Sequence, residues 1–337
     1  MFDILALGEI LLRLSPPMNE KLVRGETFEK QVGGAELNVL SGASLLGLRA
    51  GIISKIAEND IGEFARNRVR FVGVSDDYLM NDIEKDARLG IYYYENGAYP
   101  RKPRIVYDRS HTSMSKISIE DFPDTMYSLT RCFHTTGITL ALGEQVRTTA
   151  YEMIKKFKKN GALISFDVNF RSNLWSGEEA RRTIEEILPL VDIFFCSEET
   201  ARLTFKKSGN LKDMMKEFAD EYNIGVIAST QRIVHSPKIH TFGSVIYEKC
   251  SDTFYEEPPY SKIEVVDRIG SGDAYISGVL YGILSENGSC AKALSFGNAA
   301  GAIKNTIPGD MQASLRGEVE AVIQSHRLKG NDCEMVR

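Results

Sequence analysis

Short apolar runs alternate with amphipathic segments over most of the chain, and this alternation constrains the fold more than any single motif. Apolar runs of strand length, most of them followed by a helical pattern, lie at 3–8, 50–57, 131–137, 162–169, 192–197 and 224–230. Strands that alternate with helices in this way are typical of parallel βαβ units. We therefore expect an α/β fold with a large, mostly parallel sheet and helices on both of its faces.

Two stretches interrupt this alternation, because neither carries a helix between its strand-like segments. They are residues 13–32 and 78–111, and the second contains a pair of strands at 90–109 joined by the turn ENGAYPRKP. We expect both to form a small β-sheet that lies over the larger domain as a lid. The expected α/β domain is discontinuous and comprises residues 1–12, 33–77 and 112–330. The polar residues 331–337 are expected to fray.

The composition argues against several classes of protein. The 337 residues carry a formal net charge of −5, which does not suit a nucleic-acid partner. The five cysteines are spread along the chain without a CxxC pair. We therefore expect neither a zinc knuckle nor a disulfide framework. This use of cysteine indicates a reducing compartment. No apolar run has the length of a membrane span, and the N-terminal residues have the pattern of a strand, not of a signal peptide. We expect a cytoplasmic protein without a membrane partner.

Two glycines, a serine and an aspartate stand at residues 270–273, directly before the pattern of a helix. Glycine lets the backbone approach a ligand closely, and the first amides of a helix are unpaired and lie at the positive end of its dipole. The amides of Gly270, Ser271 and Gly272 are therefore expected to bind phosphate oxygens. Asp273 is expected to stay ionised near that dipole and to accept a proton from an attacking hydroxyl. The alternative is that Ser271 or Asp273 only caps the helix.

This stretch is neither a Walker loop nor GxGxxG, but together with a second motif it resembles a known family. Asp267 and residues 270–273 give the pattern Asp-x-x-Gly-x-Gly-Asp, and GGAELNVLSGASLLG (33–47) places a double glycine before a helix that carries an asparagine. In this order, and over nearly the whole chain, the motifs resemble those of the PfkB, or ribokinase-like, carbohydrate kinases. The resemblance implies a ribokinase-like fold, ATP and Mg²⁺ as cofactors, and Asp273 as the base. It also implies that the amides of residues 270–272 hold the transferring phosphoryl group.

Within that family the chain looks most like the kinases of 2-keto-3-deoxygluconate. The similar stretches are GEILLRLSPP (8–17), GIYYYENGAYPRKPRIVYDRSHTSMS (90–115), DVNFR (167–171) and NTIPGD (305–310). They imply an ATP-dependent kinase that phosphorylates the C6 hydroxyl of this sugar acid to 2-keto-3-deoxy-6-phosphogluconate. A sugar acid carries a carboxylate, which arginine binds through two parallel hydrogen bonds. The residues expected to hold the substrate are Gly34, Asn38, Tyr92, Tyr107, Arg109, Arg171 and Asp273.

The nucleotide is expected along the C-terminal ends of the strands, where open α/β sheets bind ligands. Its expected contacts are Asn169, Ser197, Thr230 and Asn298. Many members of the family carry Asn-x-x-Glu after a central strand, and here Ser197 and Thr200 stand in those places. Glu199 is therefore expected to reach the magnesium ion through water. Arg268 follows Asp267 where threonine is common, so the need for a monovalent cation is left open.

Other interpretations stay open at this point. Arg109 and Arg171 could each form an ordinary ion pair. The alternative enzyme is then a related kinase of a neutral sugar or nucleoside, such as fructose or ribose. A sugar-binding regulator of the same fold, with little or no catalysis, is a further alternative. The sequence does not distinguish the gluconate-derived substrate from its galactonate-derived epimer. An exposed strand edge of the lid predicts a homo-oligomer formed through the lid.

Overall fold

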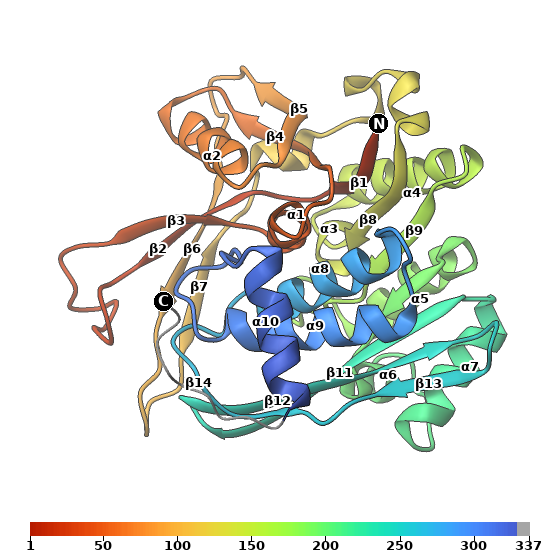
Figure 1. The fold of residues 1–337 in the computed structure, drawn as a ribbon. Coiled ribbons are helices and arrows are strands. Elements are labelled where there is room, and N and C mark those ends of the chain that lie inside the picture. The colour runs from red at the N-terminus through yellow and green to blue at the C-terminus, as the bar shows by residue number, and fades with distance from the viewer. Residues whose placement is uncertain (329–337) are drawn as a thin grey trace.

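In the computed structural model, which describes residues 1–328, the strands form two separate sheets (Figure 1). The strands are β1 (Phe2–Leu7), β2 (Leu11–Ser15), β3 (Glu29–Gly33), β4 (Ala50–Ala57), β5 (Ser75–Asp82), β6 (Gly90–Glu95), β7 (Arg104–Asp108), β8 (Thr130–Thr136), β9 (Leu163–Asp167), β10 (Ile193–Phe195), β11 (Val226–Ser236), β12 (Ile239–Glu248), β13 (Thr253–Glu256) and β14 (Tyr260–Glu264). The large sheet has the order β13-β12-β11-β10-β9-β8-β1-β4-β5, with β14 paired to β12. The small sheet has the order β3-β2-β6-β7.

The large sheet is parallel from β5 through β4, β1, β8, β9 and β10 to β11. Only β12, β13 and β14 add antiparallel pairs at one side. The predicted α/β fold with a mostly parallel sheet is therefore confirmed. The strand expected at 224–230 is longer than its apolar run, because β11 continues to Ser236 as one arm of a hairpin with β12.

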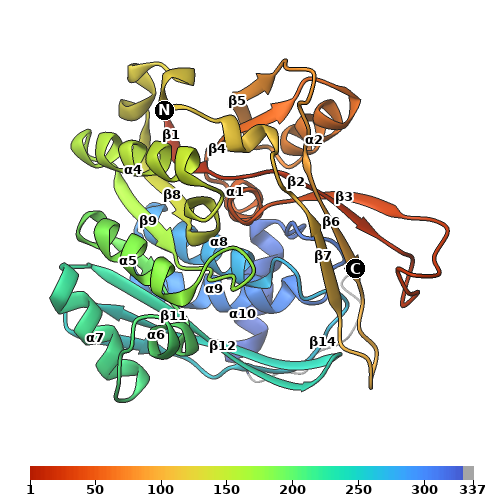
Figure 2. The same ribbon diagram turned by 180° about the vertical axis from the view of Figure 1, so that it is seen from behind.

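Helices cover both faces of the large sheet (Figures 1 and 2). They are α1 (Ala35–Leu45), α2 (Asp60–Phe71), α3 (Gly137–Leu140), α4 (Glu144–Lys159), α5 (Gly177–Ile187), α6 (Glu198–Leu203), α7 (Leu211–Tyr222), α8 (Ser271–Leu284), α9 (Cys290–Lys304) and α10 (Arg316–Arg327), with 3₁₀ turns η1 (Ser113–Lys116), η2 (Ile119–Asp121), η3 (Asp124–Ser128) and η4 (Leu188–Leu190). One apolar core contains buried residues of α1, α2, α8, α9 and α10, and the other contains residues of α4, α5 and α7. Of the described helices, none has the length and apolarity needed to cross a membrane.

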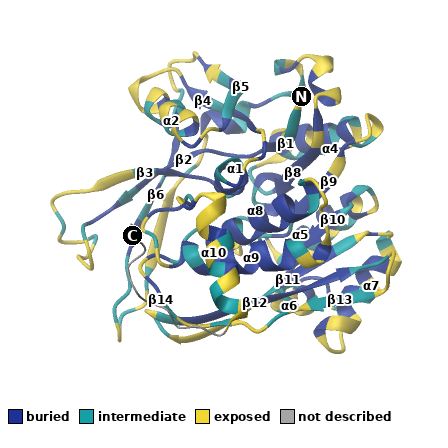
Figure 3. Cartoon of the chain, viewed as in Figure 1, coloured by how far each residue is buried: buried dark blue, intermediate teal, exposed yellow. Residues whose placement is uncertain are grey.

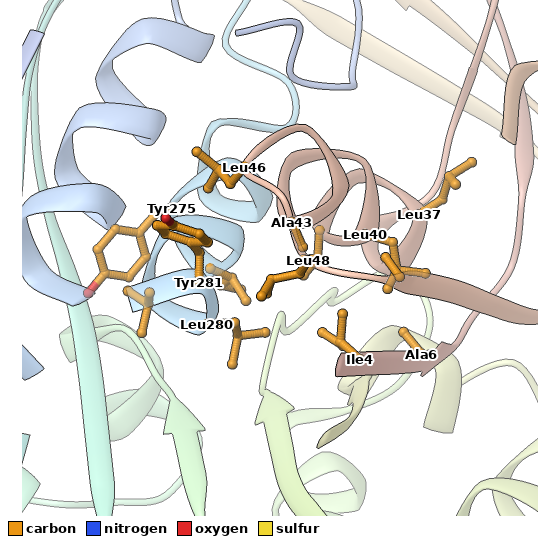
Figure 4. Packing of buried hydrophobic residues seen from close by; sticks show 14 of the residues in the cluster. Ile4, Ala6, Leu37, Leu40, Ala43, Leu46, Leu48, Tyr275, Leu280 and Tyr281 are labelled. Carbon is orange, nitrogen blue, oxygen red and sulfur yellow. The ribbon is translucent and has the colours of Figure 1, made fainter. Parts of the chain in front are cut away.

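The first core brings the N-terminal and C-terminal parts of the chain together. Leu40 of α1 lies over Ile4 and Ala6 of β1, and Leu280 and Tyr275 of α8 extend the same packing (Figure 4). All five side chains are buried. Because α1 and α8 pack side by side, the segments that precede them also come close to one another.

The small sheet lies beside the large one and leaves its outer loops exposed (Figure 3). Its strands β2, β3, β6 and β7 come largely from the two stretches expected to form it, although β2 begins at Leu11 and β3 ends at Gly33, outside residues 13–32. The boundary drawn at residue 78 was wrong, since residues 78–82 belong to β5 at the edge of the large sheet. That strand is polar, but it pairs with β4 after the helix α2 and buries Leu79, so it completes a βαβ unit. The prediction of a frayed tail at 331–337 lies outside the described residues.

Candidate active site

The first turn of α8 forms a cradle of backbone amides. Gly270 precedes the helix with a φ of 80°, and a Cβ there would collide with the carbonyl of Asp310. No side chain caps the helix, so the alternative that Ser271 or Asp273 acts only as a cap is wrong. The first helical bond runs from the Ala274 amide to the Gly270 carbonyl (2.8 Å). Of the amides before Ala274, that of Ser271 donates to the carbonyl of Arg268 at 3.3 Å, and the others have no partner within the helix and can bind an anion.

Asp273 is held in place by the N-terminal motif. Asn38, on α1, donates a hydrogen bond from Nδ2 to Asp273 Oδ2 at 2.7 Å. The two helices can approach because Gly42 leaves room for the side chain of Ser277. Two motifs that are 235 residues apart in the chain therefore meet at one carboxylate. The structure therefore brings together two residues that were both expected to hold the substrate, and their contact with a sugar stays a prediction.

The pKa of Asp273 is raised to about 7, chiefly by burial. The hydrogen bond from Asn38 and the charge of Arg171 lower this pKa, while the carboxylates of Asp310 and Glu36 raise it further. The expectation that the helix dipole keeps the group fully ionised is wrong, because burial outweighs the dipole. A carboxylate that titrates near neutrality is well suited to accept a proton from a hydroxyl.

The double glycine serves close packing at the start of α1. Gly34 has a φ of 145°, and a Cβ on it would collide with the carbonyl of Glu9. A Cβ on Gly33 would collide with the carboxylate of Asp310. Both positions therefore require glycine for steric reasons. Contact of Gly34 with a sugar stays a prediction.

A buried charged cluster joins the small sheet to the loop before α8; we call Arg13, Tyr92, Asp267 and Asp310 the Arg13 cluster. Arg13 forms ion pairs of 2.6 Å with both Asp267 and Asp310, and every side chain in the cluster is at most 4% exposed. Tyr92 donates its hydroxyl proton to Asp310. The prediction that Tyr92 binds the sugar is therefore wrong for this arrangement, because its hydroxyl is buried and already paired.

Lys304 supports the same loop from the other side. Its side chain is fully buried, and its ammonium donates to the carbonyls of Asp267 (3.3 Å) and Ile307 (3.0 Å). Asp267 also accepts from the amides of Ile269 (3.0 Å) and Gly309 (3.1 Å). The loop that leads into the cradle is therefore fixed by side chains on both sides.

Arg109 does not meet the expectation that it is free to bind a carboxylate. Its Nε donates to Glu9 Oε2 at 3.0 Å, and the other oxygen of Glu9 accepts the hydroxyl proton of Thr112 at 2.5 Å. The ion pair is nearly buried, with 9% of the Arg109 side chain exposed. Tyr107 is exposed on β7, and its ring lies 5.9 Å from that of Tyr92 across the strands. Contact of Tyr107 with a sugar stays a prediction.

Arg171 differs from Arg109, since no ion pair is found for it within residues 1–328. Its side chain is exposed, and Nη1 donates only to the carbonyl of Phe170 (3.1 Å). Its charge reaches Asp273 and Asp167 and lowers the pKa of both. Arg171 is therefore an unpaired cation beside the candidate base.

A cavity of about 820 Å³ opens beside the cradle at the C-terminal ends of β9, β10 and β11. Its wall contains the predicted residues Asn169, Arg171, Ser197, Glu199 and Thr230, together with Ser271 and Gly272 of the cradle. Asn298 does not line this cavity. It is fully buried, accepts from the hydroxyl of Ser244 (2.7 Å) and donates to Glu257 (2.8 Å) on the wall. The prediction that Asn298 contacts the nucleotide directly is therefore wrong.

Ser197 and Thr200 are hydrogen-bonded to each other, and neither side chain carries a carboxylate. Ser197 caps α6: its hydroxyl accepts from the Thr200 amide (3.2 Å) and donates to Oγ1 of Thr200 (2.8 Å). The carboxylates near them on the wall are those of Asp167, Glu198 and Glu199. Burial and the nearby Asp273 raise the pKa of Asp167 to about 7. No group of three or more potential metal ligands gathers among residues 1–328.

Several residues of the site were missed by sequence reasoning. They are Glu9, Arg13, Asp167 and Asp310. Glu9 and Arg13 stand within the apolar strand-like stretch GEILLRL, and charged side chains in such a stretch are normally buried only when they are paired. That signal pointed to partners, although it did not say which.

The chain was compared with known proteins. The profile described as "pfkB family carbohydrate kinase" matches residues 1–315. The chain is 30% identical to a 2-dehydro-3-deoxygalactonokinase of Haloferax volcanii over 335 residues, which is 99% of each chain. It is 29% identical to a 2-dehydro-3-deoxygluconokinase of Bacillus subtilis over 312 residues, 90% of this chain and 91% of that one.

Among solved structures, a 2-dehydro-3-deoxygluconokinase of Thermotoga maritima superposes with a TM-score of 0.90 at 30% identity. The superposition covers 95% of this chain and 98% of that one. The family profile, the relatives and the shared fold agree with the double-glycine motif and the cradle at α8. The chain therefore belongs to the pfkB family of carbohydrate kinases, which use ATP.

Proposed function

We propose that this protein transfers the γ-phosphoryl group of ATP to the C6 hydroxyl of 2-keto-3-deoxygluconate. The observation that carries the proposal is the position of Asp273, which Asn38 orients at 2.7 Å beside the open amides of α8. A hydroxyl placed against this carboxylate faces a group that can take its proton and amides that can hold the phosphoryl oxygens.

In the proposed reaction the bond between O6 and the γ-phosphorus forms while the bond from that phosphorus to the bridging oxygen of ADP breaks. The proton of the C6 hydroxyl passes to the Asp273 carboxylate, and ADP leaves. The amides of Ser271 and Gly272 lie on the wall of the nucleotide cavity, where they stabilise the charge on the transferring group. Closure of the small sheet over the sugar would exclude water from this step.

Magnesium suits the donor set on the cavity wall. Asp167 and Glu199 supply oxygen ligands there, and burial and the charge of Asp273 raise the pKa of Asp167, so a cation beside it would favour its charged form. Mg²⁺ keeps several waters and binds mainly through the phosphates of the nucleotide, so two carboxylates are enough. When bound, the ion neutralises phosphate charge. Asp167 would hold it directly and Glu199 through water.

An acidic sugar is favoured by the unpaired Arg171. An arginine without a counter-ion on the cavity wall, close enough to Asp273 to lower its pKa, provides two parallel donors for a carboxylate. The relatives in Bacillus subtilis and Thermotoga maritima are named as kinases of the gluconate-derived acid, and that in Haloferax volcanii as a kinase of its galactonate-derived epimer. The substrate we propose is the gluconate-derived acid, and the epimer is the second candidate.

The assay that tests this proposal measures ADP release with Mg·ATP and four sugars: 2-keto-3-deoxygluconate, its galactonate epimer, fructose and ribose. We expect the first acid to have the highest kcat/KM, and the preference for acids over neutral sugars to fall at least tenfold in Arg171→Ala. Arg182→Ala, an exposed arginine on α5, is the matched control. Faster turnover of a neutral sugar would remove the proposed role of Arg171. Binding of sugar and ATP without turnover would instead indicate a sugar-binding regulator.

A further inference from the structure

Two arginines and a histidine gather around the entrance to α8 from three segments of the chain. Arg232 of β11 lines the nucleotide cavity, on the same wall as Ser271 and Gly272. Arg268 and His240 line a second cavity of about 1010 Å³ on the other side, between the tip of the small sheet and the β11–β12 hairpin. We call Arg232, His240 and Arg268 the basic group.

The pairing of β11 with β12 places Arg232 and His240 on one face of their hairpin. Arg232 pairs with Phe242 and Val234 pairs with His240, so side chains at 232 and 240 point to the same side. Phe242, on that side, lies against Tyr275 of α8, with the ring centroids 6.0 Å apart. The face therefore points toward α8, and Arg268 is only two residues before Gly270.

The basic group lacks the negative charge that would normally accompany it. Within residues 1–328, no ion pair is found for Arg232 or Arg268. The Nδ1 atom of His240 is buried without a hydrogen-bond partner, although 99% of the side chain is enclosed. The neighbouring carboxylate of Asp267 is already paired with Arg13, and Glu264 lines the second cavity without an ion pair to either arginine.

The two arginines also disfavour one another's charge. Partial desolvation and the charge of Arg268 lower the pKa of Arg232, and burial together with both arginines lowers the pKa of His240. Arg232 is exposed and Arg268 is half-buried, so both are accessible to a ligand, and like charges in proximity disfavour one another. An arrangement of this kind is favourable once an anion lies between the charges.

We propose that Arg232 and Arg268 bind the β- and γ-phosphates of the nucleotide from opposite sides of the cradle, with His240 behind them. This inference rests on the proposed function for the identity of the anion, a nucleoside triphosphate. Arginine matches phosphate geometry through two parallel hydrogen bonds, and charge stabilisation is the main requirement of phosphoryl transfer. The basic group would supply charge at the end of the phosphate chain, whereas Ser197 and Thr200 supply none.

Calorimetry of nucleotide binding tests this assignment in Arg232→Met and Arg268→Met. The ligands are AMP, ADP and a non-hydrolysable ATP analogue, each with Mg²⁺ and without sugar. We expect the Kd of AMP to change less than twofold, because AMP lacks the β- and γ-phosphates. The Kd values of ADP and of the analogue should rise at least tenfold. Arg182→Met is the control and should match the wild type for all three ligands.

Thermal unfolding of the ligand-free variants separates a binding role from a structural one. Removal of one of two repelling charges should leave the melting temperature unchanged or raise it. A lower melting temperature together with equal losses for AMP and ADP would show that the arginines support the fold, and would overturn the proposal. Unchanged nucleotide affinities, or a loss confined to the sugar acid, would overturn it as well. Absence of sugar turnover with this binding pattern intact would contradict only the proposed function.

Discussion

The carboxylate of Asp273 is oriented by one amide group and enclosed by protein at the head of a helix. Asn38 fixes Oδ2 at 2.7 Å, and burial raises the pKa to about 7. The same burial disfavours its charged form, so the residue costs the folded protein stability at neutral pH. The proposed role as base and the stability of the fold therefore place opposite demands on this side chain.

Asp273→Asn should lower kcat by roughly 10²–10⁴, because the amide has the shape of the carboxylate but cannot accept the proton. Asn38 can still donate to the new side chain, so binding of the sugar acid and of ATP should change less than threefold. Steady-state kinetics and calorimetry on the same preparation measure both effects. A variant that keeps more than a tenth of wild-type kcat would show that another group is the base.

The difference in stability between this variant and the wild type should depend on pH. In the folded wild type Asp273 titrates near 7, against 3.8 for an ordinary aspartate, so unfolding releases a proton between these values. The wild type therefore loses stability as the pH rises from about 4 to 7. The asparagine variant has no titrating group at this position and does not show this loss. Melting curves at pH 5 and pH 8 measure this effect. The melting temperature of the variant, relative to that of the wild type, should be higher at pH 8 than at pH 5. An equal difference at both values would contradict the assigned pKa.

At this scale the sequence predicted the residues that its motifs mark and failed for those whose partners lie elsewhere in the chain. Asp273 and Asn38 belong to recognisable motifs, and they meet. Arg109 and Asn298 were expected to face ligands, but Glu9 and Glu257 occupy them. Neither partner is a neighbour in sequence, and no local pattern indicates which distant carboxylate an arginine or asparagine will meet.

At the scale of elements, the small sheet is tied to the loop before α8 by the Arg13 cluster. Arg13 stands on β2, whereas Asp267 and Asp310 belong to loops on either side of α8 and α9. Both ion pairs are buried, and removal of one partner from a buried pair leaves an uncompensated charge. The cluster therefore holds one end of the small sheet in register with the cradle.

Arg13→Met should lower the free energy of unfolding by about 3–5 kcal/mol, since it leaves Asp267 and Asp310 buried without their cation. Arg49→Met is the control: Arg49 pairs with Asp3 at 3.5 Å, and 66% of its side chain is exposed. That change should cost less than about 1 kcal/mol. Urea denaturation of both variants gives the comparison. Similar losses in the two would mean that the buried cluster contributes no more than a surface pair.

Gly270→Ala and Gly272→Ala should differ sharply although they stand in one short loop. At Gly270 the φ of 80° and the nearby carbonyl of Asp310 leave no room for a Cβ. At Gly272 no heavy atom lies within 4 Å of a Cβ. The first variant should lose several degrees of melting temperature, and the second should melt within about two degrees of the wild type. Equal melting temperatures would remove the steric account of Gly270.

Element boundaries were predicted where the pattern changes abruptly and missed where it does not. The run at 50–57 became β4 with the same bounds, because it is apolar except at Ser54 and Lys55. The strand β5 was divided by the predicted boundary at 78, because SDDYLMND alternates weakly and its pairing with β4 is not local. The small sheet was predicted from the absence of helices between its strands, which is a pattern that the sequence does carry.

At the scale of the whole molecule, we expect the small sheet to close over the sugar while the Arg13 cluster holds its base. Hydrogen exchange should show this closure. With 2-keto-3-deoxygluconate and a non-hydrolysable ATP analogue, amides of β6 and β7 should exchange at least tenfold more slowly. Those of α4, on the far face of the large sheet, should be unchanged. Equal exchange of β6 and β7 with and without ligands would rule out a closing lid.

The free edges of the small sheet, β3 and β7, keep the prediction of a homo-oligomer open. Light scattering on the purified protein decides it. A monomer at micromolar concentration would contradict the prediction.

The large sequence separation within the Arg13 cluster also determines when, during synthesis, its ion pairs can form. Arg13 and Asp310 are 297 residues apart, so their ion pair cannot form until the ribosome has made nearly the whole chain. At about 5–20 residues per second, that interval is roughly 15–60 s. Until then the nascent chain holds a charged arginine in an apolar strand without its partner. A chain that ended before Asp310 would never form this ion pair, even though it would contain both Asn38 and Asp273.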